Sequence, residues 1–444
     1  MILKSIKLTL KVITPLFMYG ADPKLPELRP SEFKGMMRFW WRAFKATDNI
    51  EKLRNEEVGI FGGSRDKEGK SKIILKVNQQ PLKTDQGYNL KKDFNLIWSY
   101  NRNIHSLDGK DAGIGYLLYS AVLHNREKSY IKPNYHFNIE LFSEDERAFD
   151  NALASLWAAI YLGGFGTRAR RGAGNVVVED IVGNCKLDFI PKGNSPNELY
   201  FWIKSNVDRC FSIINDVRVK NFCTKFSNLS FSRLIIGNQV FTDWRTALND
   251  IGQIYLRFRA SHRRDIFNTA VFGLPVMHRN VNVIGFKENE KISRRSSPVI
   301  IKVVGTTNNF FWYVIRLSGE FFEEGAVIKA QGKQRPSYKL IDKFWNQLKT
   351  QGKEFIISQP EILVEIIEKI KKGCNPDKII LFGSRARGDA HKNADIDIAL
   401  INPKAPIGNL NLYAPLDIVD LSKANTVLRN KINSEGVVIY ERTS

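Results

Sequence analysis

The C-terminal part of the chain contains Asp377-Lys-Ile-Ile-Leu-Phe-Gly-Ser384 and, after a ten-residue spacer, Asp395-Ile-Asp397. The apolar run in the first stretch predicts a buried strand, and the glycine and serine that end it predict a turn into a short helix. Two more apolar stretches, Ala394–Ile401 and Leu416–Val419, predict further strands. Residues 353–444 are therefore expected to form a small α/β domain with a mixed sheet.

Three aspartates on these strands have the pattern of a divalent-cation site. Side chains two residues apart on a strand project from the same face, and two such carboxylates repel each other unless a cation lies between them. We therefore predict that Asp395, Asp397 and Asp417 are catalytic and hold two Mg²⁺ ions, which would polarise an α-phosphate and stabilise a pyrophosphate leaving group. The alternative, that Asp395 and Asp397 are solvated strand residues, is disfavoured by the nearby Gly-Ser turn.

The Gly-Ser turn itself predicts a phosphate-binding site. Backbone N–H groups at the start of a helix, together with a serine hydroxyl, can hold a triphosphate. Arg385 and Arg387 follow directly and would balance the phosphate charge. The predicted nucleotide-binding residues are thus Gly383, Ser384, Arg385 and Arg387.

Four segments of this tail resemble, in the same order, the minimal nucleotidyltransferases (MNT) of the DNA polymerase beta-like superfamily. They are Phe382–Asp389, Ala394–Ala399, Leu416–Val419 and Glu435–Tyr440. The resemblance implies Mg²⁺-dependent transfer of a nucleoside monophosphate from an NTP, often ATP, to a protein hydroxyl or a small molecule. The family usually has a helix between the second and third carboxylate strands, whereas three prolines and a glycine in Asn402–Pro415 oppose a helix here.

The charge of the chain is divided unevenly along its 444 residues. Lys and Arg number 67 against 46 Asp and Glu, a formal net charge of +21, yet residues 353–444 hold 13 basic and 12 acidic residues. Residues 1–352 therefore carry a net charge of +20, which predicts a polyanionic partner, with nucleic acid the first candidate and a membrane surface the second. The content of 43% hydrophobic and 25% charged residues is that of a globular protein and excludes a disordered tail protein or a coiled-coil rod.

Residues 31–45 predict a helix with an apolar, aromatic face and an adjacent basic stripe. Lys34, Arg38 and Arg42 lie on this stripe, and basic residues interleaved with aromatic ones suit an RNA surface. A core helix with a solvated basic face is an equally open alternative.

A second basic segment, Gly163-Gly-Phe-Gly-Thr-Arg-Ala-Arg-Arg-Gly-Ala-Gly174, lies between a predicted helix and a predicted strand. A Rossmann or P-loop phosphate site needs the order strand, glycine loop, helix, so we exclude a nucleotide cradle here. Arg168, Arg170 and Arg171 among glycines favour close approach to a phosphodiester chain. The alternative is a solvated arginine turn.

The basic region also resembles a known family, the RAMP superfamily, and most closely the first-numbered subunit of the Cmr (type III-B CRISPR) effector complex. The matching segments are Ile13–Phe17, Glu27–Arg42, Glu57–Gly62, Arg170–Gly174, Phe272–Pro275 and Arg294–Pro298. The resemblance implies an α+β fold with two ferredoxin-like (RRM-like) domains, which we place at residues 1–190 and 191–352, before the tail at 353–444. It also implies a non-catalytic subunit that contacts the 3′ side of a guide RNA, a target RNA and other RAMP subunits in antiviral defence.

Other features of the sequence bound its function. Four cysteines without a C-x-x-C pair predict reduced thiols in the cytoplasm, and no run of 18 apolar residues predicts a membrane span. Whether the tail is an active enzyme stays open. The alternatives to an effector subunit are a stand-alone, template-independent nucleotidyltransferase acting on RNA, an enzyme that transfers nucleoside monophosphate to a partner protein, and a degenerate structural tail.

Overall fold

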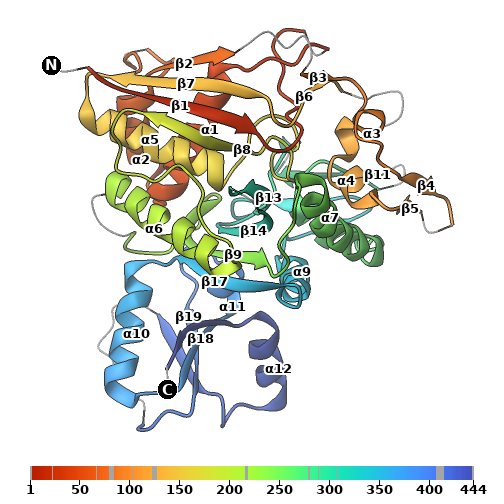
Figure 1. Cartoon of the computed structure of the whole chain (residues 1–444). Coiled ribbons are helices and arrows are strands. Elements are labelled where there is room, and N and C mark those ends of the chain that lie inside the picture. The colour runs from red at the N-terminus through yellow and green to blue at the C-terminus, as the bar shows by residue number, and fades with distance from the viewer. Residues whose placement is uncertain are drawn as a thin grey trace.

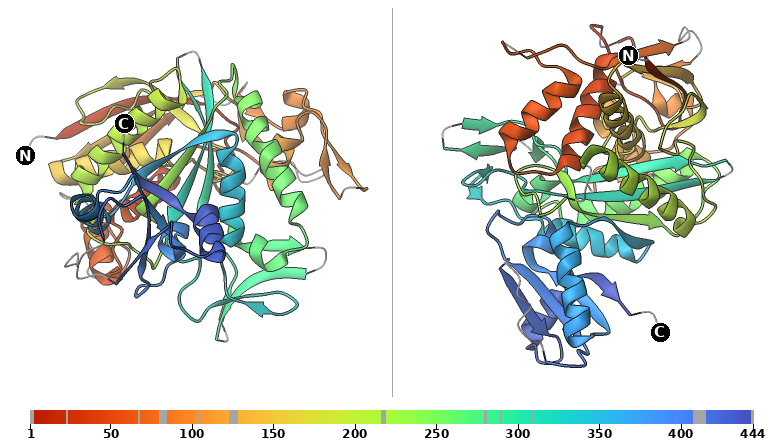
Figure 2. Two further views of the ribbon diagram at one scale, coloured as in Figure 1. Left: turned by 90° about the horizontal axis from the view of Figure 1, so that it is seen from below. Right: turned by 90° about the vertical axis from the view of Figure 1, so that its left-hand side faces the viewer.

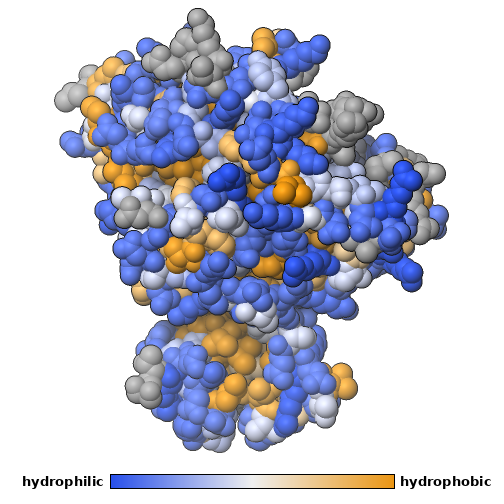
Figure 3. Space-filling model, turned by 45° about the vertical axis from the view of Figure 1, so that its right-hand side comes forward, coloured by the Kyte–Doolittle hydropathy of each residue, from blue (hydrophilic) through white to orange (hydrophobic). Residues whose placement is uncertain are grey.

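The computed structural model describes most of the chain. The residues outside the description are 1–2, 23, 67, 80–84, 104, 123–127, 216–218, 279–280, 289, 308, 407–414 and 443–444. The expectation that no helix occurs between Asn402 and Pro415 therefore lies largely outside the described residues. Figure 1 shows a large upper body and a smaller tail below it, and Figure 3 shows that the molecule narrows where the two meet.

The first half of the body is built on a four-stranded antiparallel sheet. Its strands, in spatial order, are β2 (Ile74–Gln79), β7 (His136–Ser143), β1 (Lys4–Val12) and β8 (Val176–Val182). Along β1, buried apolar residues alternate with more exposed ones, so one face of the sheet packs on helices and the other faces solvent. α1 (Pro30–Lys45) follows β1, and α5 (Glu146–Tyr161) joins β7 to β8.

The second half of the body repeats this arrangement. Its sheet has the spatial order β13 (Val299–Gly305), β14 (Phe310–Ser318), β9 (Asn228–Gly237) and β17 (Gly352–Ser358). α7 (Trp244–Ser261) lies between β9 and β13 in sequence, and α9 (Lys339–Lys349) lies between β14 and β17. Nearly every residue of β9, β13 and β14 is buried, so this sheet is covered on both faces.

The second sheet continues past residue 352, where the sequence placed the end of the second domain. β17 pairs antiparallel with β9, and its Phe355 and Ile356 face Leu234 and Arg233 in register. The second sheet therefore runs to Ser358, because this strand completes its edge.

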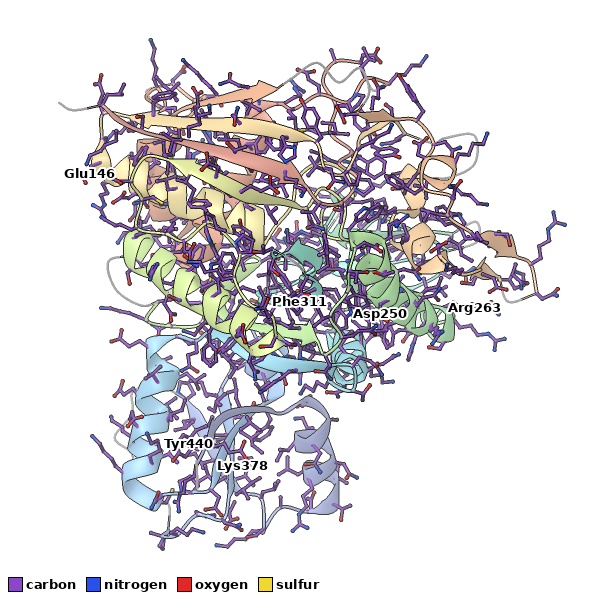
Figure 4. All side chains as sticks on the ribbon, viewed as in Figure 1. Glu146, Asp250, Arg263, Phe311, Lys378 and Tyr440 are labelled. Atoms are coloured by element: carbon purple, nitrogen blue, oxygen red, sulfur yellow. The ribbon has the colours of Figure 1, made fainter. Side chains whose placement is uncertain are left out.

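A layer of helices separates the two sheets. α1 and α5 pack against each other and against α6 (Pro196–Asn215), and α1 and α6 also contact the second sheet through β9 and β17. Figures 1 and 2 show this layer between the sheets, and Figure 4 shows Phe311 of β14 in the interior of the body. Trp40, Trp41 and Trp157 are fully buried here and form a large part of the core.

Further elements surround the two sheets. They are α2 (Ile50–Phe61), β3 (Gln86–Gly87), α3 (Leu90–Asp93), β4 (Ser99–Asn101), β5 (Ser106–Asp108), α4 (Ala112–Leu117), η1 (Tyr119–Ala121), β6 (Tyr130–Ile131), α8 (Ile266–Thr269), η2 (Ala270–Phe272), β10 (Val276–His278), β11 (Val281–Lys287), β12 (Glu290–Ile292), β15 (Val327–Lys329) and β16 (Lys333–Gln334). No helix in the described ranges is long and apolar enough to cross a bilayer.

The tail contains the mixed sheet that the sequence predicted. Its order is β20 (Leu416–Asp420), β19 (Ile396–Ile401), β18 (Lys378–Phe382) and β21 (Val437–Glu441), with β19 and β20 parallel and the other pairs antiparallel. The helices are α10 (Glu361–Cys374), the short α11 (Gly383–Arg387) and α12 (Thr426–Glu435). α10 and α12 lie on opposite sides of the sheet in Figure 1, and apolar residues of each helix pack on the face that it covers.

Lys302 is a buried basic residue on β13, the edge strand of the second sheet. Its side chain donates a hydrogen bond to the carbonyl oxygen of Ile160 at 2.8 Å, and burial lowers its pKa from 10.5 to about 7. Since the folded state binds this proton more weakly than the unfolded state, stability is expected to rise as the pH rises from about 7 towards 10.5.

Lys302→Met is expected to raise the free energy of unfolding at pH 6 by about 2 kcal/mol, because it removes the desolvated ammonium group at the cost of one hydrogen bond. At pH 9 the gain should shrink. Urea unfolding at both pH values measures it, with the exposed Lys7→Met as the control. An equal loss of stability at both pH values would contradict the expectation.

Candidate functional site

The candidate catalytic aspartates come together at one edge of the tail sheet. Asp397 on β19 pairs in register with Asp417 on β20 and with Phe382 on β18. Asp395 precedes Asp397 by two residues and is exposed, as is Asp417, whereas Asp397 is half-buried. The structure thus places two carboxylates side by side on neighbouring strands and the third immediately before one of them.

The electrostatics of Asp397 reflect this crowding. Burial raises the pKa of Asp397, and the charges of Asp417, Asp395 and Glu435 raise it further, against an opposing effect of Lys431. A carboxyl group among like charges is stabilised by any cation that binds between them.

The three aspartates have oxygen donors that a divalent cation could bind. Carboxylate oxygens are the protein ligands that Mg²⁺ prefers, and the charges of Asp417, Asp395 and Glu435 add to the effect of burial in raising the pKa of Asp397. In the part of the chain that the structure describes, no three His, Cys, Asp or Glu side chains converge closely enough to hold a metal ion. The aspartates thus have oxygen donors of the kind that Mg²⁺ binds, but Asp395, Asp397 and Asp417 do not converge into a metal site among the described residues.

Gly383 brings the Gly-Ser turn directly against the aspartates. Its φ is +71°, and a Cβ at this position would lie 2.0 Å from Oδ2 of Asp397. Only glycine both adopts this backbone conformation readily and leaves room for the side chain of Asp397. The close approach of the turn to the Asp-x-Asp strand therefore depends on Gly383. The neighbouring Ser384 is half-buried, and its hydroxyl has no hydrogen-bond partner within the described residues.

Glu435 is a site residue that the sequence did not identify. The N–H of Gly383 donates to Oε1 of Glu435 at 3.1 Å, and Nη1 of Arg387 donates to Oε2 at 2.8 Å. Lys431 lies 3.8 Å from the same carboxylate, which is only 8% exposed. The carboxylate of Glu435 therefore accepts bonds from the groups that were predicted to hold phosphate oxygens.

The two arginines of the motif have different partners. Arg387 pairs with Glu435 and, at 3.2 Å, with Asp389. Arg385 is buried and donates instead to the carbonyl oxygens of Lys392 and Ala394, at 3.1 and 2.8 Å. The structure thus places Arg387 beside the Gly-Ser turn and Arg385 against the segment that leads to Asp395.

The basic stripe of α1 is anchored on α2. Arg38 and Arg42 donate to the two carboxylate oxygens of Glu57, at 3.2 and 2.6 Å, and this carboxylate is only 9% exposed. The side chains of Arg38 and Arg42 remain 30% and 38% exposed. Lys34 donates to the hydroxyl of Ser71 at 2.6 Å.

The arginines of the glycine loop divide between surface and interior. Arg168 is half-buried, has φ +65° and donates to Ser120 at 2.7 Å. Arg170 donates to the carbonyl of Ser297, and its burial lowers its pKa to about 9.

Arg171 is 9% exposed and donates to the carbonyl of Phe272 at 2.5 Å. Its guanidinium lies 5.0 Å from the ring centroid of Tyr255, and the backbone carbonyl of Arg170 accepts from Ile301 of β13 at 3.2 Å. Arg170 and Arg171 therefore join the first half of the body to the second, a role that the local glycine pattern did not indicate.

Comparison with known proteins identifies both parts of the chain. Residues 9–177 match the RAMP superfamily, and residues 364–444 match the polymerase beta nucleotidyltransferase family. Over 188 residues the chain is 35% identical to CRISPR system Cmr subunit Cmr1-2 of Pyrococcus furiosus, which covers 38% of this chain and 92% of that protein. The chain belongs to the Cmr1 family.

Two further comparisons extend the Cmr1 likeness across the body. The chain is 28% identical over 297 residues to Cmr subunit Cmr1-1 of the same organism, covering 63% of this chain and 77% of that protein. The crystal structure of apo Cmr1 from Pyrococcus furiosus aligns with a TM-score of 0.55 at 20% identity, over 81% of this chain and 99% of that one. The predicted resemblance to the RAMP and polymerase beta-like families is confirmed, with the Cmr1 body joined to a nucleotidyltransferase tail.

The Gly-Ser motif of the tail is docked on the Cmr1-type body. Arg233 of β9 donates to the carbonyl of Ala386 at 3.0 Å, and Arg316 of β14 donates to the carbonyl of Arg387 at 2.6 Å. The N–H of Gly319 donates to Gly388 at 3.0 Å. The short helix that carries the motif is therefore held by the buried sheet of the body.

These arginines are themselves paired inside the body. Arg233 lies 3.1 Å from Glu354 of β17, and Arg316 lies 2.7 Å from Asp342 of α9, with both arginines only 3% exposed. Displacing an arginine that is buried, ion-paired with a carboxylate and hydrogen-bonded to a carbonyl has a large free-energy cost. The body and the Gly-Ser motif therefore share one charged network.

Proposed function

We propose that this chain is an RNA-binding subunit of a type III-B CRISPR (Cmr) effector complex, with the 3′ side of a guide RNA and a target RNA as ligands. Other RAMP subunits of that complex are its partners. The observation that carries the proposal is membership of the Cmr1 family together with a net charge of +20 on residues 1–352. Purification of the tagged chain from its host tests it, because associated RAMP subunits and a short guide RNA should be recovered.

We also propose that the body consists of two ferredoxin-like (RRM-like) units, 1–190 and 191–352, with β17 added to the second. The support is the repeated order strand, helix, strand, strand, helix, strand and the repeated spatial order of strands. The tail then forms a third unit.

Of the six predicted RNA contacts, we propose Lys34, Arg38, Arg42 and Arg168 as direct ones, since none of these four side chains is fully buried. Arg170 and Arg171 act by fixing the loop that carries Arg168, because their guanidinium groups are bound within the body.

Replacing Lys34, Arg38 and Arg42 with glutamine is expected to weaken RNA binding and to lower the slope of log K against log salt by about 2, at roughly 0.7 per lost phosphate contact. The variant also carries Glu57→Gln, so that no buried carboxylate is left unpaired, and Glu57→Gln alone is the control. Fluorescence anisotropy over a salt series measures the slope. An unchanged slope would remove α1 from the interface.

For the tail we propose transfer of a nucleoside monophosphate from an NTP, ATP the first candidate, to an acceptor hydroxyl. Asp395, Asp397 and Asp417 would hold Mg²⁺, which supplies charge stabilisation at the α-phosphate. Gly383, Ser384 and Arg387 would receive the triphosphate, while Arg385 fixes the segment before Asp395. The support is the match to the polymerase beta nucleotidyltransferase family and the contact of Gly383 with Asp397.

ATP labelled at the α-phosphate, incubated with the chain, Mg²⁺ and RNA, separates the possible outcomes. Label on RNA indicates an RNA nucleotidyltransferase, and label on protein indicates modification of the chain or a partner. Absence of both label and Mg²⁺-dependent nucleotide binding indicates a structural tail.

Glu435→Gln is expected to raise the affinity for a non-hydrolysable ATP analogue about tenfold, since a neutral amide competes less with phosphate for Gly383 and Arg387. Isothermal titration calorimetry in Mg²⁺ measures it, with Glu441→Gln on β21 as the control. Equal or weaker binding would show that Glu435 does not compete with the nucleotide.

A further inference from the structure

A cleft of about 610 Å³ lies where the body meets the tail. The body contributes residues 45–49, which begin at the last residue of α1, and residues 219–222, which precede β9. The tail contributes Arg385, Ile362 of α10 and the segment around Ala394. The cleft thus lies on the α10 side of the tail sheet, whereas α12 and Glu435 lie on the other.

The charge of the cleft is predominantly positive. Lys220 and Lys392 line it from the body and the tail, both are exposed, and neither has a carboxylate partner within the described residues. Lys45 also lines it, paired with Glu56 at 2.7 Å. The acidic member of the lining, Asp48, accepts hydrogen bonds from the backbone N–H groups of a neighbouring loop, so its charge is already satisfied there.

Arg385 adds a buried cation with an unused donor. It is 8% exposed, its guanidinium carbon lies 5.0 Å from the ring centroid of Phe222, and its buried Nε has no hydrogen-bond partner among the described residues. A buried N–H group without an acceptor raises the free energy of the folded state. An anionic acceptor bound beside Nε of Arg385 would remove this cost.

The surroundings indicate which anion this is. Lys45 is the last residue of α1, so the basic stripe of Lys34, Arg38 and Arg42 leads along that helix to the cleft. At its other end, the cleft is lined by Ala394 and Ile396, the two neighbours of the exposed Asp395. A chain of phosphates can follow the helix stripe through the cleft to the start of β19, beyond which Asp395 and Asp397 project from the opposite face of the sheet, whereas an isolated anion explains only the cleft.

We propose that this cleft binds the phosphodiester backbone of single-stranded RNA and leads it to the start of β19, the end of the strand from which Asp395 and Asp397 project. A volume of this size accommodates roughly one to two nucleotides. This proposal rests on the proposed function, because it takes RNA as the ligand of the body. It identifies RNA as the substrate that the body delivers to the tail.

The test uses the full chain with a ten-nucleotide, fluorescein-labelled single-stranded RNA, in the absence of Mg²⁺ and NTP. Lys220→Gln with Lys392→Gln is expected to weaken binding about tenfold and to lower the salt slope by about 1.4, at roughly 0.7 per phosphate contact. Lys343→Gln with Lys372→Gln, one exposed lysine from the body and one from the tail, is the matched control and should change both little. A 4-thiouridine at one end of the RNA should crosslink to residues 219–222 or 392–396.

Equal effects of the two lysine pairs, or crosslinks confined to other segments, would overturn the proposal. So would displacement of the RNA by AMP, which would make the cleft a mononucleotide site, or by a glutamate-rich peptide, which would make it a protein-docking site. If the unmodified chain does not bind RNA at all, the proposed function of the body is contradicted, and not only the role of the cleft. The absence of transferase activity in the tail would not change this binding measurement.

Discussion

Asp397→Asn is expected to reduce Mg²⁺-dependent nucleotide transfer about 1000-fold or more, equivalent to about 4 kcal/mol of transition-state stabilisation. Asp397 is the residue that links the parts of the site, because it pairs in register with Asp417 and contacts Gly383 of the Gly-Ser turn. An asparagine has the same shape but supplies no charge to a cation. RNA binding by the body should be unchanged.

The same variant is not expected to lose stability. The raised pKa of Asp397 means that the folded state disfavours its charged form, so a neutral side chain should leave the unfolding temperature equal or higher at neutral pH. Asp377→Asn is the control, because Asp377 pairs with Lys404 outside the cluster. Transfer at the wild-type rate by the Asp397 variant would show that the tail chemistry does not use this aspartate.

Arg316→Met is expected to destabilise the chain by about 3–5 kcal/mol, the cost of leaving a buried carboxylate without its partner. Arg316 pairs with Asp342 and also donates to the carbonyl of Arg387, so its loss affects the body and the motif helix α11 together. Hydrogen exchange at the amides of 383–389 should therefore accelerate. Urea unfolding gives the free energy.

A double variant separates the buried charge from the docking contact. Arg316→Met with Asp342→Leu should recover most of the stability, because apolar pairs of similar volume replace buried ion pairs at little cost. The exchange at α11 should stay fast in the double variant, since the bond to Arg387 is still missing. Stability within about 1 kcal/mol of wild type for Arg316→Met alone would contradict a coupled network.

The tail was predictable because its signals are local. The Gly-Ser turn, the spacer and the Asp-x-Asp strand lie within a short stretch, and strand alternation alone places two aspartates on one face. Glu435 was not identified because it bonds to Gly383 across 52 positions of sequence. No periodicity of α12 distinguishes this glutamate from a solvated one.

The fold class of the body was predictable from the sequence, but the contacts of its side chains were less so. Basic and glycine-rich composition indicated an exposed arginine loop, yet Arg171 enters the interior through a bond to Phe272, 101 positions away. Nothing in Gly352–Ser358 shows which sheet this segment joins, so the pairing of β17 with β9 could not be predicted from the sequence. Pairing between distant strands depends on the tertiary core rather than on the local pattern.

The docking of the glycine loop on β13 also protects the chain from self-association. β13 is the outermost strand of its sheet, and its sequence Val-Ile-Ile-Lys-Val-Val-Gly is the apolar, β-branched kind that recruits other strands. Arg171 forms a parallel bridge to Ile301 there and occupies part of that edge. A fragment that begins after residue 190 would expose it, so the second half of the body is expected to aggregate when it is produced without the first.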